Sequence, residues 1–212
     1  LAAKNSTRCF LVDLTEESCS NLKLPLETVV CEPDFDNDKL ILTQKITFKV
    51  SKADCSNQPL FINAKQPTIH KSQIDSHLVD LQLAKDNLGK QYDDVFTFTV
   101  PEELQNQLSN VGQTFVLDVN ADMCISSDLE GAYYSYSKVD GQPDQKLLVT
   151  QFESHFARKS FICVDEPEAK STFNFKFIVP DGIDVLFNTV ISNCSLEKKL
   201  TFQNGNFLLI IY

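Results

Sequence analysis

The strongest constraint on the fold is a period of two in the apolar residues. Between Leu40 and Val50, apolar side chains alternate with lysine and threonine, which is typical of a strand with one buried and one solvated face. Phe173 to Val179 repeats this alternation with phenylalanine at every second position. Shorter runs of the same kind, separated by turn residues, lie at Leu60 to Ile62, Val79 to Leu83, Asp93 to Val100 and Gln113 to Val119. The pattern predicts an all-β chain, folded as a single-domain β-sandwich.

Helical signals are few, so we expect only one or two short helices. Pro101-Glu-Glu-Leu predicts one of them, because proline suits a first helical turn and acids favour a helix N-terminus. Near the end of the chain, Asn204-Gly205 predicts a tight hairpin turn, with the segment 207–212 as the returning strand. That strand is apolar on both faces. We therefore expect it to be covered, or to drive self-association through an open edge.

The charge of the chain limits its partners. A net charge of −10 disfavours nucleic acid and anionic lipid, since both are bound through lysine and arginine. The segment 207–212 is the longest apolar run and is too short to span a bilayer. A protein or peptide partner, or a second copy of the chain, is the remaining expectation.

The densest run of identifiable residues is Thr150 to Val179. It resembles the run TQFE-x-x-x-AR-x-x-F-P-C-F-DEP-x-x-K-A-x-F in the N-terminal domain of zinc aminopeptidases of the aminopeptidase N type. The matching residues are Thr150, Gln151, Phe152, Glu153, Ala157, Arg158, Phe161, Cys163, Asp165, Glu166, Pro167, Lys170 and Phe173. The chain departs from the run at Ile162, Val164 and Ser171–Thr172.

Weaker matches extend this resemblance over most of the chain, including LEGAYYSYS at 129–137, and Asn63 stands where the family has histidine. The resemblance implies a saddle-like all-β domain over residues 26–212. Residues 1–25 show little apolar periodicity, and we expect them to form an extension tied down by a disulfide.

The resemblance assigns one candidate binding site. In the family, the acid at the place of Glu153 projects into the neighbouring zinc cleft and meets the substrate's α-amino group, and Gln151 would flank it. The alternative is that Glu153 is an ordinary exposed acid, the usual fate of glutamate. Arg158, Asp165, Glu166 and Lys170 are expected to pin the adjoining turn through ion pairs.

Catalytic and metal-binding residues are expected to be absent from this chain. The family holds zinc in an HExxH helix of the next domain, and this sequence has no HExxH and only three histidines. We therefore predict no cofactor in this chain and no peptide hydrolysis by it alone. We expect His70, His77 and His155 to be solvated.

The cysteines point to an extracellular location. Cys163 matches the family's buried, unpaired cysteine, which leaves six disulfide candidates: Cys9, Cys19, Cys31, Cys55, Cys124 and Cys194. Together with glycosylation sequons at Asn5 and Asn193, these predict a secreted, disulfide-bonded glycoprotein. The alternative is a cytosolic protein whose cysteines are unpaired, buried thiols.

Two functions follow from these observations. The first is a secreted, non-catalytic binding protein derived from the N-terminal domain of a zinc aminopeptidase. The second is the substrate-recognition domain of a full zinc aminopeptidase, which removes N-terminal residues from peptides. An HExxH helix encoded beyond Tyr212 would decide for the second.

Overall fold

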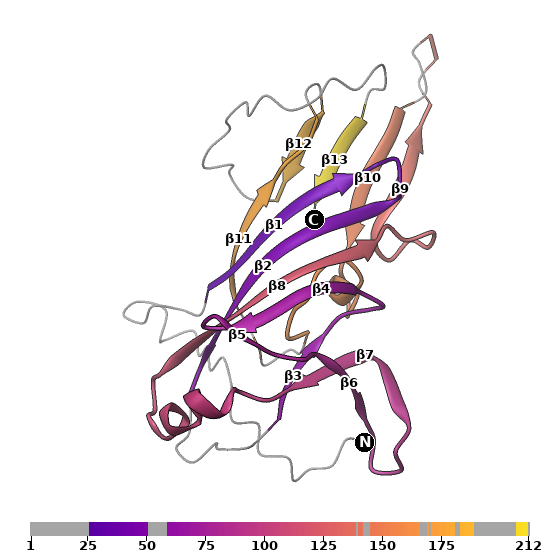
Figure 1. The fold of residues 1–212 in the computed structure, drawn as a ribbon. Coiled ribbons are helices and arrows are strands. Elements are labelled where there is room, and N and C mark those ends of the chain that lie inside the picture. The colour runs from indigo at the N-terminus through magenta and orange to yellow at the C-terminus, as the bar shows by residue number, and fades with distance from the viewer. Residues whose placement is uncertain are drawn as a thin grey trace.

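The described part of the chain forms three β-sheets, seen in Figure 1. The structure, a computed structural model, describes residues 26–50, 59–138, 140–141, 145–165, 169, 171–180, 183–188 and 207–211. The largest sheet contains, in spatial order, β11 (Thr172–Phe177), β1 (Leu26–Asp34), β2 (Lys39–Lys49), β8 (Thr114–Cys124), β4 (Thr68–Ile74) and β5 (His77–Leu78). The prediction of an all-β fold is confirmed.

Two smaller sheets complete the architecture. One has the order β12 (Asp184–Phe187), β13 (Phe207–Ile211), β10 (Gln145–Gln151) and β9 (Gly131–Ser137). The other has the order β3 (Leu60–Asn63), β7 (Gln91–Phe98) and β6 (Gln82–Lys85). In Figure 1 the long, curved strands β1, β2 and β8 lie in front of the β12–β9 sheet, and the β6–β7 hairpin projects from the lower end.

The core lies on the inner face of the large sheet, where the alternating pattern places it. On β2 every second side chain from Leu40 to Phe48 is buried, and the lysines lie on the other face. On β8 the buried set includes Phe115, Leu117 and Met123. Removing these side chains from water supplies the main stabilisation, at roughly 25 cal/mol per Å² of apolar surface.

One predicted strand is largely a connection between two sheets. The run from Val79 to Leu83 was expected to be continuous, but the chain leaves the large sheet after β5 and enters the small sheet at β6. The crossing is held where the Ser72 hydroxyl donates to the carbonyl of Val79, at 2.7 Å. The apolar side chains of Val79, Leu81 and Leu83 still pack against the core, which explains the pattern that suggested a strand.

The final strand is not an open edge. β13 pairs in parallel with β10 on one side and with β12 on the other, so its backbone groups are occupied. Edge pairing through β13, one of the two expectations for this strand, is therefore wrong, while self-association through another surface stays a prediction. The prediction of this segment as the returning strand of a hairpin is also wrong, because both neighbours of β13 run parallel to it. The turn predicted at Asn204-Gly205 lies outside the described residues.

The longer helix in the described part of the chain is a 3-10 helix, η2 (Glu102–Ser109), preceded by Pro101. The short helix predicted from Pro101-Glu-Glu-Leu is thus present, and its two apolar side chains, Leu104 and Leu108, are both buried. A second, shorter 3-10 segment is η3 (Ala157–Lys159). None of the helices among the described residues is long and apolar enough to cross a membrane.

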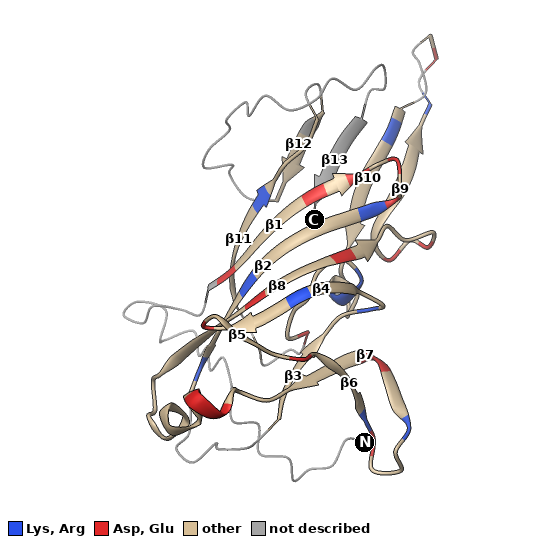
Figure 2. Ribbon diagram, in the orientation of Figure 1, with Lys and Arg blue, Asp and Glu red and all other residues tan. Residues whose placement is uncertain are grey.

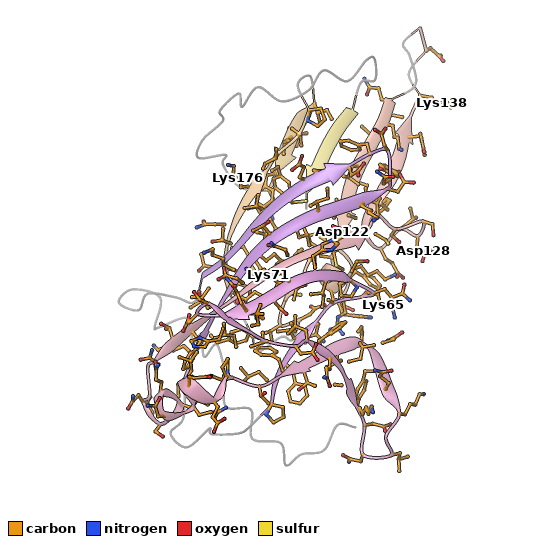
Figure 3. All side chains as sticks on the ribbon, viewed as in Figure 1. Lys65, Lys71, Asp122, Asp128, Lys138 and Lys176 are labelled. Carbon is orange, nitrogen blue, oxygen red and sulfur yellow. The ribbon has the colours of Figure 1, made fainter. Side chains whose placement is uncertain are left out.

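The outer face of the large sheet carries both signs of charge. Figure 2 shows basic and acidic segments interspersed along β1, β2, β8 and β4. Lys39 and Lys45 on β2 each pair with an aspartate on β8, and Lys71 and Asp122 lie over the same stretch of the sheet (Figure 3). This alternation of charges fits a solvated face, with no basic stripe of the kind that binds nucleic acid.

Candidate functional site

The candidate site is a turn at the end of β10. The strand ends at Gln151, and the chain turns through Glu153 and Ser154, joined by a cis peptide bond, into η3. The side chains of Gln151 and Glu153 are exposed, and the Gln151 side-chain oxygen accepts a hydrogen bond from the Glu153 amide at 3.3 Å. This contact places the two predicted binding residues on one local structure.

Phe152 anchors the turn from within. Its ring packs edge-on against Phe161 at 5.5 Å between centroids, and its carbonyl accepts the amide of Phe156 at 2.9 Å. Beneath the turn is a cavity of about 30 Å³ lined by apolar atoms. A cavity of this size has room for about one or two water molecules and none for a peptide, so any ligand of this turn would bind on its outer side.

The segment after the turn is fixed to the large sheet by a buried glutamine. Gln44 of β2 is 1% exposed, and its side-chain amide donates to the Ile162 carbonyl and accepts from the Ile162 amide, both at 2.9 Å. The side chain thus acts as a strand partner for one residue, Ile162. Because Ile162 is buried, its backbone amide and carbonyl would otherwise lack partners.

Asn63 fixes the same segment to β3. Its backbone exchanges two hydrogen bonds with Cys163, at 2.7 and 3.1 Å, and its side-chain oxygen accepts the amide of Asp165 at 3.1 Å. The residue that stands where the family has histidine therefore has a positioning role here, carried by hydrogen bonds that a neutral amide can make.

Arg158 links three parts of the molecule. Its guanidinium pairs with Asp165 at 2.8 Å and with Asp94 of β7 at 2.9 Å, and it also donates to the Asp165 carbonyl. The Arg158 carbonyl accepts the amide of Lys65 at 2.7 Å. The ion pair expected between Arg158 and Asp165 is present; Glu166 and Lys170 lie outside the described residues.

Glu27 is a buried acid beneath this segment. Its side chain lies at the start of β1, is 3% exposed, and has one oxygen without a partner among the described residues. Burial raises the pKa of this carboxyl to about 7, against a smaller opposing effect of a hydrogen bond with Ser171. The acid is therefore held largely in its neutral form at slightly acid pH.

The cysteines in the described part of the chain have free thiols. Cys31 and Cys163 are buried, and burial raises the pKa of both thiols, to about 12 for Cys31. Such thiols are poor nucleophiles, because the reactive form is the thiolate. Cys124 is exposed and unpaired. Cys9, Cys19, Cys55 and Cys194 lie outside the described residues, as do Asn5 and Asn193, so the disulfides and glycans stay predictions.

The histidines do not gather around a common point. His70 lies at a bulge of β4 and its Nε2 is 3.0 Å from Asp122 of β8, so it has a carboxylate partner and is not simply solvated as expected. His77 contacts the carbonyl of Asp75, and His155 contacts the hydroxyl of Ser154. Over the ranges that the structure describes, no group of histidine, cysteine and acidic residues could hold a metal ion.

Sequence reasoning missed three residues of this region: Glu27, Gln44 and Asp94. Gln44 could have been found from the sequence, because it occupies an inward position of the alternating β2 pattern. A polar residue at such a position must find a hydrogen-bonding partner. Asp94 could not have been found in this way, since its hydrogen bond with Arg158 joins segments far apart in the chain.

Comparison with known proteins identifies the fold's relatives. The model of the peptidase M1 N-terminal domain family matches residues 26–209. The chain belongs to this family. It is 39% identical over 95 residues to aminopeptidase N of Lactobacillus delbrueckii subsp. lactis, which covers 43% of this chain and 11% of that protein. It is 31% identical over 132 residues to aminopeptidase N of Bos taurus, which covers 61% of this chain and 13% of that protein.

The solved structure of yeast LTA4 hydrolase in complex with bestatin has the same fold. The TM-score is 0.53 at 15% identity, over 74% of this chain and 23% of that chain. At this identity the likeness concerns the fold alone. The aligned segments span only 11% and 13% of these two relatives, so the matches show the family and do not extend the activity of those longer proteins to this chain.

Proposed function

We propose that this M1 N-terminal domain presents the Glu153 carboxylate to the free α-amino group of a peptide, as the recognition part of a zinc aminopeptidase. The observation that carries the proposal is the position of Glu153. Its side chain is exposed on a turn whose flanks are fixed by Gln44, Asn63 and Arg158. A rigid turn with a projecting carboxylate suits recognition of a cation, because little conformational entropy is lost on binding.

The chemistry of the proposal is selection by charge. An α-ammonium group donates hydrogen bonds to a carboxylate, whereas an acetylated amino group has no charge to pair. Gln151 adds a neutral acceptor and donor next to Glu153. Zinc and the residues that hydrolyse the peptide bond would come from a catalytic domain joined to this one, since this sequence contains no HExxH.

The binding step can be tested on this chain with L-leucinamide, a minimal ligand with a free amino group. We expect saturable NMR shifts of the Gln151 to Ser154 amides, and none with N-acetyl-L-leucinamide. Glu153→Gln should abolish the shifts. Glu103→Gln, which removes an exposed acid from η2, should leave them unchanged. Equal responses of the two variants would refute the proposed role of Glu153.

A second candidate is a secreted, free-standing binding protein without catalytic activity. The sequons at Asn5 and Asn193 and the six cysteines outside the family motif favour it. The intact mass of the natural protein, before and after reduction, separates the candidates. A mass near 23.9 kDa plus glycan, with hydrogens gained on reduction, supports the free-standing protein. A mass several times larger supports the aminopeptidase.

A further inference from the structure

The Glu153 turn meets a second part of the molecule at the start of β9. Gly131 is the register partner of Gln151, the residue at which β10 ends and the turn begins. The same glycine also lies against the far end of the turn. A Cβ atom at Gly131 would stand 2.6 Å from the Cβ of Lys159 and 3.1 Å from the hydroxyl oxygen of Ser160. Gly131 thus contacts both ends of the turn.

Only glycine satisfies this position. The Gly131 φ angle is +69°, in the left-handed region where side chains are disfavoured. A separation of 2.6 Å between two carbon atoms is far inside van der Waals contact, so any larger residue must push the Lys159 backbone away. The absence of a side chain at Gly131 therefore sets how closely η3 approaches β9.

A charge pair reinforces the contact. The Lys159 ammonium pairs with the carboxylate of Glu130, which directly precedes Gly131. The Lys159 side chain is 22% exposed and lies over the ring of Phe156, 5.5 Å from its centroid. Partial burial strengthens the pair relative to one in open solvent. The Glu130–Lys159 ion pair thus joins the start of β9 to η3, at the far end of the turn.

We infer that Glu130, Gly131 and Lys159 form a clamp that positions Glu153 for the amino group of its ligand. The three residues are positioning residues, since none of them is placed against the ligand. This inference rests on the proposed function. It goes beyond it, because the motif that suggested the role of Glu153 has no fixed residue type at Lys159, and Glu130 lies outside that motif.

The experiment combines amide hydrogen exchange with L-leucinamide affinity in the 212-residue chain. Glu130→Lys and Lys159→Glu each break the pair, and the double variant restores it with the charges exchanged. Each single variant should speed exchange at the Phe156 and Lys159 amides about fivefold, the effect of losing one partly exposed ion pair on local opening. Each should also weaken leucinamide binding, and the double variant should recover both properties.

Gly131→Ala provides an independent test through the close contact, and should speed exchange at the same amides more than either charge variant does. The melting temperature of every variant serves as a control for global unfolding. Unchanged exchange in the single variants, or faster exchange with unchanged leucinamide affinity, would overturn the clamp. If Glu153→Gln leaves leucinamide binding intact, the proposed function is refuted, and the inference of a clamp is refuted together with it. Loss of binding in Glu153→Gln with normal binding in the clamp variants would overturn the clamp alone.

Discussion

The buried acid Glu27 should make the stability of the domain depend on pH in an unusual direction. Most carboxylates in proteins stabilise the fold when ionised, so stability falls as pH falls. Glu27 is 3% exposed, and burial raises its pKa from 4.5 to about 7. The folded protein therefore holds this proton over a range in which the unfolded chain has released it. The contribution of Glu27 is fully present below pH 4.5 and is lost as pH rises towards 7.

The size of the effect follows from the separation of the two pKa values. Each pH unit of separation changes the free energy of unfolding by about 1.4 kcal/mol, so the total change is about 3 kcal/mol. The variant Glu27→Gln keeps the shape of the side chain and cannot titrate. The free energy of unfolding of the wild type, relative to that of this variant, should fall by about this amount between pH 4.5 and pH 7.

Urea denaturation at a series of pH values measures this difference, because subtracting the variant removes the contributions of all other titrating groups. Glu32→Gln, on the solvent face of the same strand, is the matched control and should run parallel to the wild type. Parallel curves for Glu27→Gln and the wild type from pH 4.5 to 8 would refute the reasoning, since they would mean that the carboxyl titrates alike in the folded and unfolded states.

Three further substitutions separate buried from exposed contacts, each measured by urea denaturation at pH 7. Gln44→Leu should lower the free energy of unfolding by about 2–4 kcal/mol, because it leaves the amide and carbonyl of Ile162 buried without partners. A loss below about 1 kcal/mol would mean that water takes the place of the Gln44 side chain. Arg158→Met should lower the free energy of unfolding by about 3 kcal/mol, because two partly buried carboxylates lose their counterion. An unchanged free energy of unfolding would contradict the linking role of Arg158. Lys45→Ala should change stability by less than about 0.5 kcal/mol, since its pair with Asp118 lies at the surface.

The local pattern of the sequence predicted most of the strands. The alternation from Leu40 to Val50 became β2 with every inward position buried, and Pro101-Glu-Glu-Leu marked the start of η2. These predictions succeeded because burial on one face of a strand or helix imposes a period that a short window can show. The run from Val79 to Leu83 misled for the same reason: its partly buried side chains produced a strand-like pattern, although only Gln82 and Leu83 pair with another strand.

Contacts between distant segments could not be predicted from the sequence. The parallel pairing of β11 with β1 joins residues near opposite ends of the domain, and no local pattern encodes it. The clamp on the Glu153 turn depends on Gly131 meeting Lys159, a contact that only the path of β9 creates. The motif at 150–173 suggested Gln151 and Glu153 as binding residues, which stays a prediction, and the tertiary structure shows the contacts that hold their turn in place.

The most direct test of the central claim is the kinetics of amino-acid anilide hydrolysis by the natural protein that contains this chain. If Glu153 binds the substrate's amino group, Glu153→Gln should lower kcat/KM about 10–100-fold, the loss expected for a charge-assisted hydrogen bond, and Glu103→Gln should not. A natural protein that hydrolyses no anilide, or one in which Glu153→Gln matches the wild type, would contradict the account.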